Sequence, residues 1–391
     1  MIRNLLVAAL FFPVPLCAQR PAARPAAQYF PDRFDWQHRR PADVGMDSAL
    51  IAAAVAQAQA DSSRGLRDQA AQQARTFGRE PHGDIIGPMK ERGPQGGIIV
   101  RHGYIVAEWG EPARVDMTHS VTKTFLSTVV GLAWDRGLVR DVHDKAAPYM
   151  PGSEYWASAH NDSVTWENLL QQNSDWQGTL WDKPDWADRP RGEKPEAVAR
   201  ATPGTAYEYN DVRVNMLSLL ALNVWRRPLP QVLREEIMEP IGASNTWRWE
   251  GYQNSWVDLD GQWIQSVSGG GHWGGGMFIS AYDMARFGLL FLRNGKWKDR
   301  QLISEKWIQM ARTPSTPQDT YGYMNWFLNT AQKELKAAPA TAVRFVGNGN
   351  NIIYVDWDND IVAVFRWING SGNASVEKML ASLKSAPALK P

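Results

Sequence analysis

The spacing of apolar and polar residues predicts strands near both ends of the chain. Residues 96–110 contain two β-rich runs around a His-Gly pair, which is typical of a hairpin. Residues 351–367 repeat this pattern around an Asp-Asn-Asp turn. Helical patterns lie outside both hairpins, at residues 46–60, where Ala and Leu dominate, and at residues 375–386. The two ends therefore predict a sheet with flanking helices.

The central part of the chain, from residue 135 to residue 272, gives helical patterns and long loops but few strand signals. Strong helical spacing occupies residues 210–225, and residues 277–295 also predict a helix. Residues 175–200 are rich in Trp, Pro, Asp and Arg, which favours a lid or cleft loop over a simple connector. This order predicts an α/β fold in which a sheet domain carries a helical insert.

The N-terminus has the features of an export signal. Arg3 precedes an apolar stretch that is too short to span a bilayer, and Ala18 fits a cleavage position. Cleavage there would leave no cysteine, because Cys17 is the only one in the chain. Lipid attachment at Cys17 is the less favoured alternative, since Leu16 is bulkier than such processing usually takes. We expect export, most simply to a bacterial periplasm.

These patterns divide the chain into predicted parts. The linker prediction rests on a composition rich in Pro, Ala and Arg. The parts are a signal peptide at 1–18, a linker at 19–45, an α/β sheet domain at 46–119 and 273–391, and a mostly helical domain with cleft loops at 120–272.

The bulk composition narrows the class of function. The formal net charge is +1 and no long basic run occurs, which disfavours nucleic acid as a partner. No later segment is apolar enough to span a bilayer, so we predict no stable membrane insertion. The seven histidines are scattered without a metal-ligand motif, so we predict no metal and no other cofactor. Some of the 19 tryptophans suit a cleft that binds a small molecule, and the sequence carries no signal of oligomeric state.

The stretch THSVTKTFLS, residues 118–127, places one lysine at the head of an apolar helix. A buried ammonium is costly unless it is paired or loses its proton, and a lysine with a lowered pKa can act as a general base. Lys123 shares a helix face with Ser120, which lies where free N–H groups favour developing negative charge. This S-x-x-K pattern indicates an activated serine. The same pattern also arises from a serine that caps the helix and a lysine whose side chain extends to solvent.

A second stretch, PGTAYEYND at residues 203–211, resembles the Pro-Gly…Tyr-x-Asn element of a family of serine hydrolases. The family is related to class C β-lactamases, D-alanyl-D-alanine carboxypeptidases, family esterases and 6-aminohexanoate-dimer hydrolases. HSVTKTFLSTVVGLAWDRGLV, SVTWENLLQQNSDW and GGGMFISAYDMARFGLLFL resemble the same family in the same order. The resemblance implies a β-lactamase/transpeptidase-like fold, an antiparallel sheet flanked by helices with an all-helical insert.

The resemblance also implies three catalytic roles. Ser120 would be the acylated nucleophile, Lys123 its base partner and Tyr209 the third member. Tyr207 is the competing tyrosine, but the spacing after the Pro-Gly pair favours Tyr209. A phenol near an ammonium has its ionised form favoured, so Tyr209 would take the serine proton and return it to the leaving group.

Two departures from the family pattern bear on the substrate. Asp211 stands where the family has an amide, unless Asn210 takes over its task. Asn348, in FVGNGNNIIYVDW, falls about where the family has Lys or His, so the usual anchor for a substrate carboxylate is missing. A backbone N–H near Asn348 and Gly349 would complete an oxyanion hole with the N–H of Ser120.

Two further residues are candidates for substrate binding. His272 lies between glycines in SGGGHWGGGMF, residues 268–278, and would line the cleft, although a lone histidine is more often structural. Arg344 could supply a positive charge near the strand, but a surface role is favoured.

We therefore predict an exported serine hydrolase that forms an acyl-enzyme on Ser120 and cleaves carboxylic esters or non-lactam amides. A peptidoglycan D,D-peptidase or β-lactamase is the alternative enzyme, and a non-catalytic peptide- or lactam-binding protein is the alternative outside enzymes. The intact Ser120, Lys123 and Tyr209 favour an enzyme. Replacing Lys123 by alanine is expected to lower turnover by orders of magnitude without unfolding, since its buried charge is a stability liability.

Overall fold

The computed structural model describes residues 28–188 and 200–385. The predicted signal peptide and Cys17 lie outside these residues, so export and the choice between cleavage and lipid attachment stay predictions. Within the described ranges, no helix is both long enough and apolar enough to cross a membrane.

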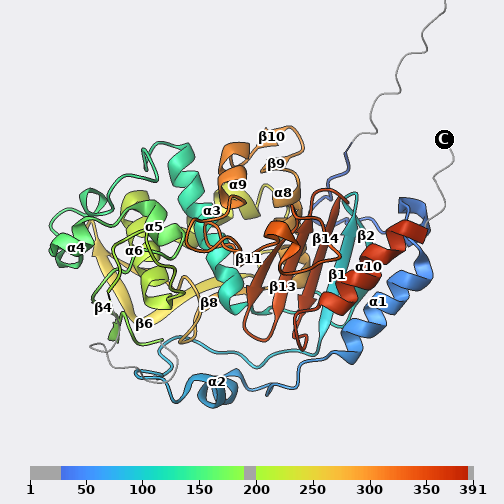
Figure 1. The fold of residues 1–391 in the computed structure, drawn as a ribbon, viewed down its shortest axis with the longest axis horizontal. Coiled ribbons are helices and arrows are strands. Elements are labelled where there is room, and N and C mark those ends of the chain that lie inside the picture. Colours follow the sequence, from blue (N-terminus) through green and yellow to red (C-terminus); the bar gives the residue numbers. More distant parts are fainter. Residues whose placement is uncertain (1–27, 189–199, 386–391) are drawn as a thin grey trace, which may run out of the picture.

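The two predicted hairpins meet in one antiparallel sheet of six strands (Figure 1). The N-terminal hairpin adds to the C-terminal hairpin because β1 pairs with β14, with Ile98 opposite Val364. Both hairpins and their union are therefore confirmed. In sheet order, the strands are β11 (Phe327–Leu328), β12 (Val343–Gly347), β13 (Asn351–Asp356), β14 (Ile361–Arg366), β1 (Gly96–Arg101) and β2 (Tyr104–Trp109).

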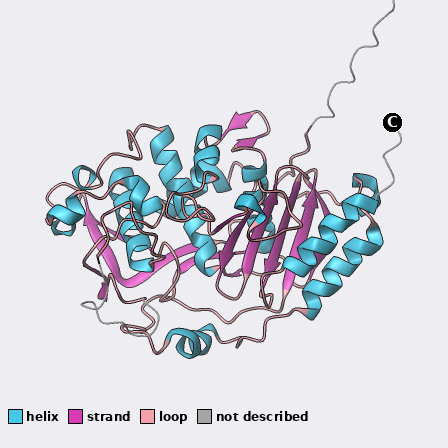
Figure 2. Cartoon of the chain, in the orientation of Figure 1, coloured by secondary structure: helices cyan, strands magenta, loops and turns pink. Residues whose placement is uncertain are grey.

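Helices cover both faces of this sheet (Figures 1 and 2). Both faces of the sheet are apolar, because successive side chains of a strand point to opposite faces. In β1, Ile98 and Val100 belong to one buried cluster and Ile99 belongs to the other. Helices α1 (Ser48–Ala60) and α10 (Asn373–Ser385) pack together on the face of Ile99. Helix α8 (Ala281–Leu292) covers the opposite face. The predicted fold class, a sheet flanked by helices, is confirmed.

The remaining helices gather beside the sheet, mostly between β3 and β6 in the chain (Figure 1). Helix α6 begins where Asn210 accepts a hydrogen bond from the N–H of Arg213, and α5 begins with a capping box at Thr165. The start of α6 agrees with the helix predicted over residues 210–225. These helices are α2 (Gln69–Phe77), α3 (Thr122–Asp135), α4 (Ala159–Asp162), α5 (Trp166–Leu170), α6 (Asp211–Trp225), α7 (Leu229–Leu233) and α9 (Glu305–Ala311).

A second sheet, with the strand order β3-β8-β6-β7, was not predicted from the sequence. Its long hairpin lies inside residues 120–272, for which a mostly helical domain is predicted. The pairing register shifts between Gly251 and Trp256, and this irregularity breaks the alternation that would have marked the strand. The strands are β3 (Asp116–Met117), β6 (Arg248–Leu259), β7 (Gln262–Val267) and β8 (Gly276–Ile279).

One other local prediction differs from the structure. Residues 276–279 form β8, so the helix predicted from residue 277 begins only at Ala281. Helix α2 lies in a stretch for which no element was predicted. Residues 28–45, predicted as linker, run beside β2, where Tyr29 stacks on Tyr104 with ring centroids 4.1 Å apart. The division into domains remains a prediction.

Short elements complete the described chain. The 3₁₀ helices are η1 (Pro41–Val44), η2 (His119–Val121), η3 (Ala147–Tyr149), η4 (Glu154–Trp156) and η8 (Thr330–Gln332), and η7 (Arg234–Met238) is a π-helix. The remaining two-residue strands are β4 (Thr179–Leu180), β5 (Lys183–Pro184), β9 (Lys296–Trp297) and β10 (Arg300–Gln301).

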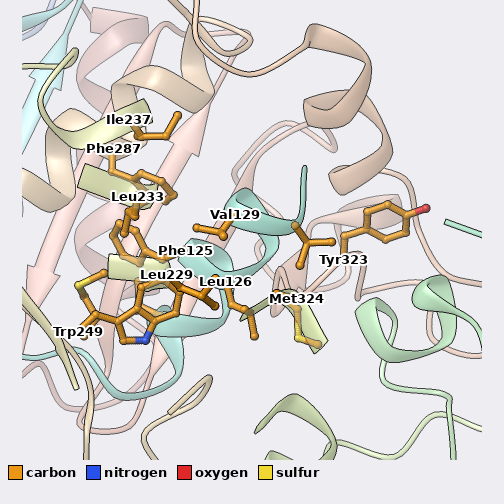
Figure 3. Close-up of a cluster of buried hydrophobic side chains, with 14 of the residues drawn as sticks. Phe125, Leu126, Val129, Leu229, Leu233, Ile237, Trp249, Phe287, Tyr323 and Met324 are labelled. Carbon is orange, nitrogen blue, oxygen red and sulfur yellow. The ribbon is translucent and has the colours of Figure 1, made fainter. Parts of the chain in front are cut away.

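Helix α3 runs through the centre of the larger core. Every residue from Thr122 to Ala133 is buried, polar ones included. Figure 3 shows Phe125, Leu126 and Val129 of α3 among apolar side chains of other elements. This packing holds the start of α3 rigidly, which matters because the candidate catalytic residues lie there. The labelled neighbours are Leu229, Leu233, Ile237, Trp249, Phe287, Tyr323 and Met324.

Candidate active site

Ser120 and Lys123 lie at the junction of η2 and α3. Ser120 is the middle residue of η2, and Lys123 follows one turn later on the same side. The Lys123 Nζ lies 3.1 Å from the Ser120 Oγ, which is hydrogen-bonding distance. The contact predicted from the S-x-x-K spacing is therefore present in the fold.

Tyr209 reaches the same point from the segment before α6. Its Oη donates a hydrogen bond of 2.7 Å to the Ser120 Oγ, and its ring centroid lies 4.5 Å from the Lys123 Nζ. Trp326 packs edge-on against this ring with centroids 3.9 Å apart, which fixes the ring plane. Tyr207 instead contacts Tyr321, so Tyr209 is the tyrosine that meets the serine.

Asp211 is the ionic partner of Lys123. Its Oδ1 lies 2.9 Å from the Lys123 Nζ, and the two side chains are only 2% and 1% exposed. Burial lowers the pKa of Lys123, and the adjacent Asp211 carboxylate opposes part of that shift. Asn210 does not take over this contact, because its amide caps α6 and donates to the carbonyl of Asp185.

The environment of Tyr209 favours the neutral phenol. Burial raises its pKa well above the ordinary value, and the Asp211 carboxylate adds to this shift. The hydrogen bond to Ser120 opposes the shift without reversing it. The pKa shift therefore runs against the expected ionised phenol, because burial and then the Asp211 carboxylate both disfavour the phenolate beside Lys123.

Gly270 closes over the Lys123–Asp211 pair. A Cβ at this position would lie 1.7 Å from the Asp211 Oδ1 and 2.3 Å from the Lys123 Nζ, far inside contact distance. Only a glycine therefore lets the backbone of this loop approach the ion pair.

Gly270→Ala is expected to separate Lys123 from Asp211 and to lower both stability and hydrolytic turnover. Overpacking of this kind costs about 1–3 kcal/mol, and displacement of Lys123 should cost more than about tenfold in kcat. Urea unfolding and steady-state kinetics measure the two effects. Gly65→Ala is the control, because its backbone is not left-handed and the added carbon would come no nearer than 3.3 Å to any atom, the tip of the flexible Gln72 side chain. Equal losses in both variants would contradict the steric argument.

Ser120 opens into a cavity of about 410 Å³. Its aromatic lining comes from Phe77, Tyr209, Trp326 and Phe327, which agrees with the prediction of a partly aromatic cleft. The other lining residues are Gln73, Glu80, His119, Asp188, Asp211, Gly270, Gly271, His272, Val346, Gly347, Asn348 and Asn350.

His272 lines this cavity, as the sequence suggested, but it is already paired. Its Nε2 lies 2.7 Å from the Glu80 Oε2, and its ring packs against Phe77 with centroids 4.6 Å apart. Burial disfavours the charged ring, but the hydrogen bond to Glu80 and the nearby carboxylates outweigh it and raise the pKa of His272. Glu80 could not be identified from sequence patterns, because its contact with His272 joins segments 192 residues apart.

Asp188 is a second cavity residue that the sequence analysis did not single out. Its Oδ2 accepts a hydrogen bond of 2.6 Å from the backbone N–H of Asp211. Its Oδ1 is buried with no hydrogen-bond partner among the described residues. Burial raises the pKa of Asp188 to about 6. The only sequence signal was its position in the 175–200 stretch, predicted as a lid or cleft loop.

The end of β12 lies against the nucleophile. A Cβ on Gly347 would lie 1.8 Å from the Thr118 carbonyl oxygen and 3.0 Å from the Ser120 nitrogen, so the two backbones touch. Asn348 follows and lines the cavity, whereas Gly349 lies in the β12–β13 turn outside the lining. Arg344 is buried and donates to Asn373 and to the carbonyl of Ser371, away from the lining.

Comparison with known proteins agrees with this architecture. The family model described as Beta-lactamase matches residues 95–386. The structure of a family VIII carboxylesterase is 16% identical in sequence, with a TM-score of 0.56; the match covers 87% of this chain and 97% of the carboxylesterase. A penicillin-binding protein homologue from Caulobacter crescentus is 15% identical, with a TM-score of 0.54; the match covers 88% of this chain and 99% of the homologue.

A third structure, the penicillin binding protein from Bacillus halodurans, shares 17% identity, with a TM-score of 0.51 and coverages of 74% and 96%. At these identities, the structural matches speak for the fold alone. None of the curated proteins matches the chain.

Proposed function

Since the chain belongs to the beta-lactamase family of serine hydrolases, we propose that it hydrolyses carboxylic esters, or amides other than lactams, through an acyl-enzyme on Ser120. The observation that carries this proposal is the convergence of Lys123 and Tyr209 on one serine oxygen, at 3.1 and 2.7 Å. A serine that contacts a buried amine and a partly buried phenol at the edge of a cavity has the parts of an activated nucleophile.

The reaction would proceed in two halves. The Ser120 Oγ attacks the substrate carbonyl carbon as its proton leaves, and the carbonyl oxygen gains the negative charge of a tetrahedral intermediate. The backbone N–H groups of Ser120 and Asn348 are the proposed donors to that oxygen, since the preceding Gly347 touches the Ser120 backbone. Collapse expels the alcohol or amine, and water then releases the acyl group by the same steps.

The charges around the cavity support neutral substrates over carboxylate-bearing ones. Three carboxylates line it, those of Glu80, Asp188 and Asp211, and the lining residues that the structure describes include no lysine or arginine. His272 is engaged by Glu80 and Lys123 by Asp211, so neither cation offsets the negative charge of Asp188, for which the described residues give no ion pair. A substrate carboxylate near the scissile bond would meet like charge, which disfavours lactam antibiotics and peptides with a free C-terminus.

A matched substrate panel tests this preference. p-Nitrophenyl butyrate should show a kcat/KM at least about tenfold higher than the p-nitrophenyl half-ester of succinate, a difference of about 1.4 kcal/mol in transition-state binding. A chromogenic cephalosporin should be hydrolysed more slowly than either ester. Raising the salt concentration should narrow the difference between the two esters because it screens the carboxylates. Faster hydrolysis of the cephalosporin than of both esters would contradict the proposal.

A further inference from the structure

We propose that Asp211 is the final acceptor of the Ser120 proton and that Lys123 relays the proton to it. This inference rests on the proposed hydrolase function. The Lys123 Nζ lies 3.1 Å from the Ser120 Oγ and 2.9 Å from the Asp211 Oδ1, so one amine bridges the alcohol and the carboxylate. Both contacts are hydrogen-bonding distances, and proton transfer along them requires no movement of heavy atoms.

The burial of the pair gives Asp211 a role that an amide could not fill. Lys123 and Asp211 are 1% and 2% exposed, and Gly270 packs against both side chains. At such low exposure each charge is costly without an opposite charge nearby, so the resting pair is ammonium with carboxylate. When a new negative charge forms beside Lys123, a carboxylate can give up its own charge by taking a proton from the ammonium, whereas an amide only accepts a hydrogen bond.

The proposed step balances in protons and charge. The Ser120 Oγ–H proton passes to the Lys123 Nζ while an Nζ proton passes to the Asp211 Oδ1. The freed Oγ electron pair forms the bond to the carbonyl carbon, and the carbonyl π pair moves to its oxygen. Lys123 stays an ammonium beside the forming bond, and Asp211 becomes a neutral acid. The negative charge of the Asp211 carboxylate is thereby transferred to the tetrahedral oxygen, which lies beside the Lys123 ammonium.

Tyr209 then acts as the proton donor in the same sequence. Its phenol gives the Oη proton to the departing alkoxide or amide nitrogen as that bond breaks. Lys123 replaces this proton and recovers its own from Asp211, which restores the starting state. The raised pKa of Tyr209, caused by burial and by Asp211, suits a group that begins and ends as a neutral phenol.

Other titratable groups face Lys123, and the test must separate them from Asp211. Asp188 lies close enough to favour its charged form, and His119 of η2 is its buried neighbour. Burial lowers the pKa of His119 to about 4, so this ring is neutral over the working range. Among the described residues, Asp188 is therefore the competing carboxylate that needs a variant of its own, and His272, whose pKa Asp211 and Asp188 help to raise, is the other titratable group beside Asp211.

The test is the pH dependence of kcat/KM for a p-nitrophenyl ester with wild-type protein, Asp211→Asn and Asp188→Asn. The relay predicts that Asp211→Asn lowers the plateau and moves the acid limb up by at least about one pH unit, because neutral Lys123 must then be the base. Asp188→Asn should leave the acid limb without that upward shift. Asp260→Asn, an exposed residue at the β6–β7 turn, is the charge-matched control with unchanged kinetics.

An unchanged acid limb in Asp211→Asn, or the same upward shift in Asp188→Asn, overturns the relay. Lys123→Arg is the second variant, because arginine keeps the charge but does not release a proton. It should lose more than about 10³-fold in kcat, and retention of a tenth of wild-type turnover also overturns the relay. Ester turnover by wild-type protein distinguishes the failures, since its absence refutes the hydrolase and its presence with an unchanged limb refutes only the relay.

Discussion

Ser120→Ala is expected to lower ester turnover by at least about 10⁴-fold, the range found when the nucleophile of a serine hydrolase is removed. The substitution deletes the oxygen that both Lys123 and Tyr209 contact. Because it removes one atom at the edge of a cavity, the free energy of unfolding should change little. Burst and steady-state kinetics measure the loss, and urea unfolding checks the fold.

The matched control is Ser127→Ala. Ser127 is a buried serine on the same helix α3, but it does not line the cavity. Its replacement should leave turnover within about twofold of wild type. If Ser120→Ala hydrolysed esters as fast as this control, the nucleophile would have to be another residue.

Lys123→Met is expected to lose more than about 10³-fold in turnover and about 3–5 kcal/mol of stability. The sequence alone favoured a replacement that does not unfold the protein, because Lys123 was then a lone buried charge. The structure predicts a loss of stability instead, because removing Lys123 leaves the 2%-exposed Asp211 carboxylate without its partner. Urea unfolding of the variant measures the stability term, and its kcat measures the catalytic one.

The double variant Lys123→Met with Asp211→Leu separates the two effects. Removing both charges should recover most of the lost stability, since a buried pair can be replaced by apolar groups at little cost. Turnover should stay as low as in Lys123→Met, because the base is still missing. Additive losses of stability in the double variant would contradict a direct interaction between the two side chains.

The parts of the site that could be predicted are those encoded locally. Ser120 and Lys123 are one helical turn apart, so their spacing alone places them together. Tyr209 lies 89 residues from Ser120 and was found only through the resemblance of its surrounding stretch to a family. The sequence did not decide between Asn210 and Asp211. Asn210 caps α6 and Asp211 is its first residue, and only the fold determines which side chain contacts Lys123.

The parts that could not be predicted depend on contacts between distant segments. Glu80 meets His272 across the cavity, and both stretches read as irregular or Gly-rich. Asp188 is brought to the backbone of Asp211 by a loop whose path has no periodic signal. The β6–β7 hairpin was not predicted for another reason: its irregularity after Gly251 interrupts the two-residue alternation of a regular strand. Elements with regular local spacing could therefore be predicted from the sequence, whereas the paths of loops and irregular strands could not.

The most direct test of the account is covalent labelling of the folded protein with a fluorophosphonate, followed by intact-mass measurement and peptide mapping. The account predicts one adduct per chain, located on Ser120, and slower labelling of Lys123→Met. Ser120→Ala should take up no label. Folded wild-type protein that forms no adduct, or one that carries it on another residue while Ser120 stays free, would contradict the assignment of Ser120 as the activated nucleophile.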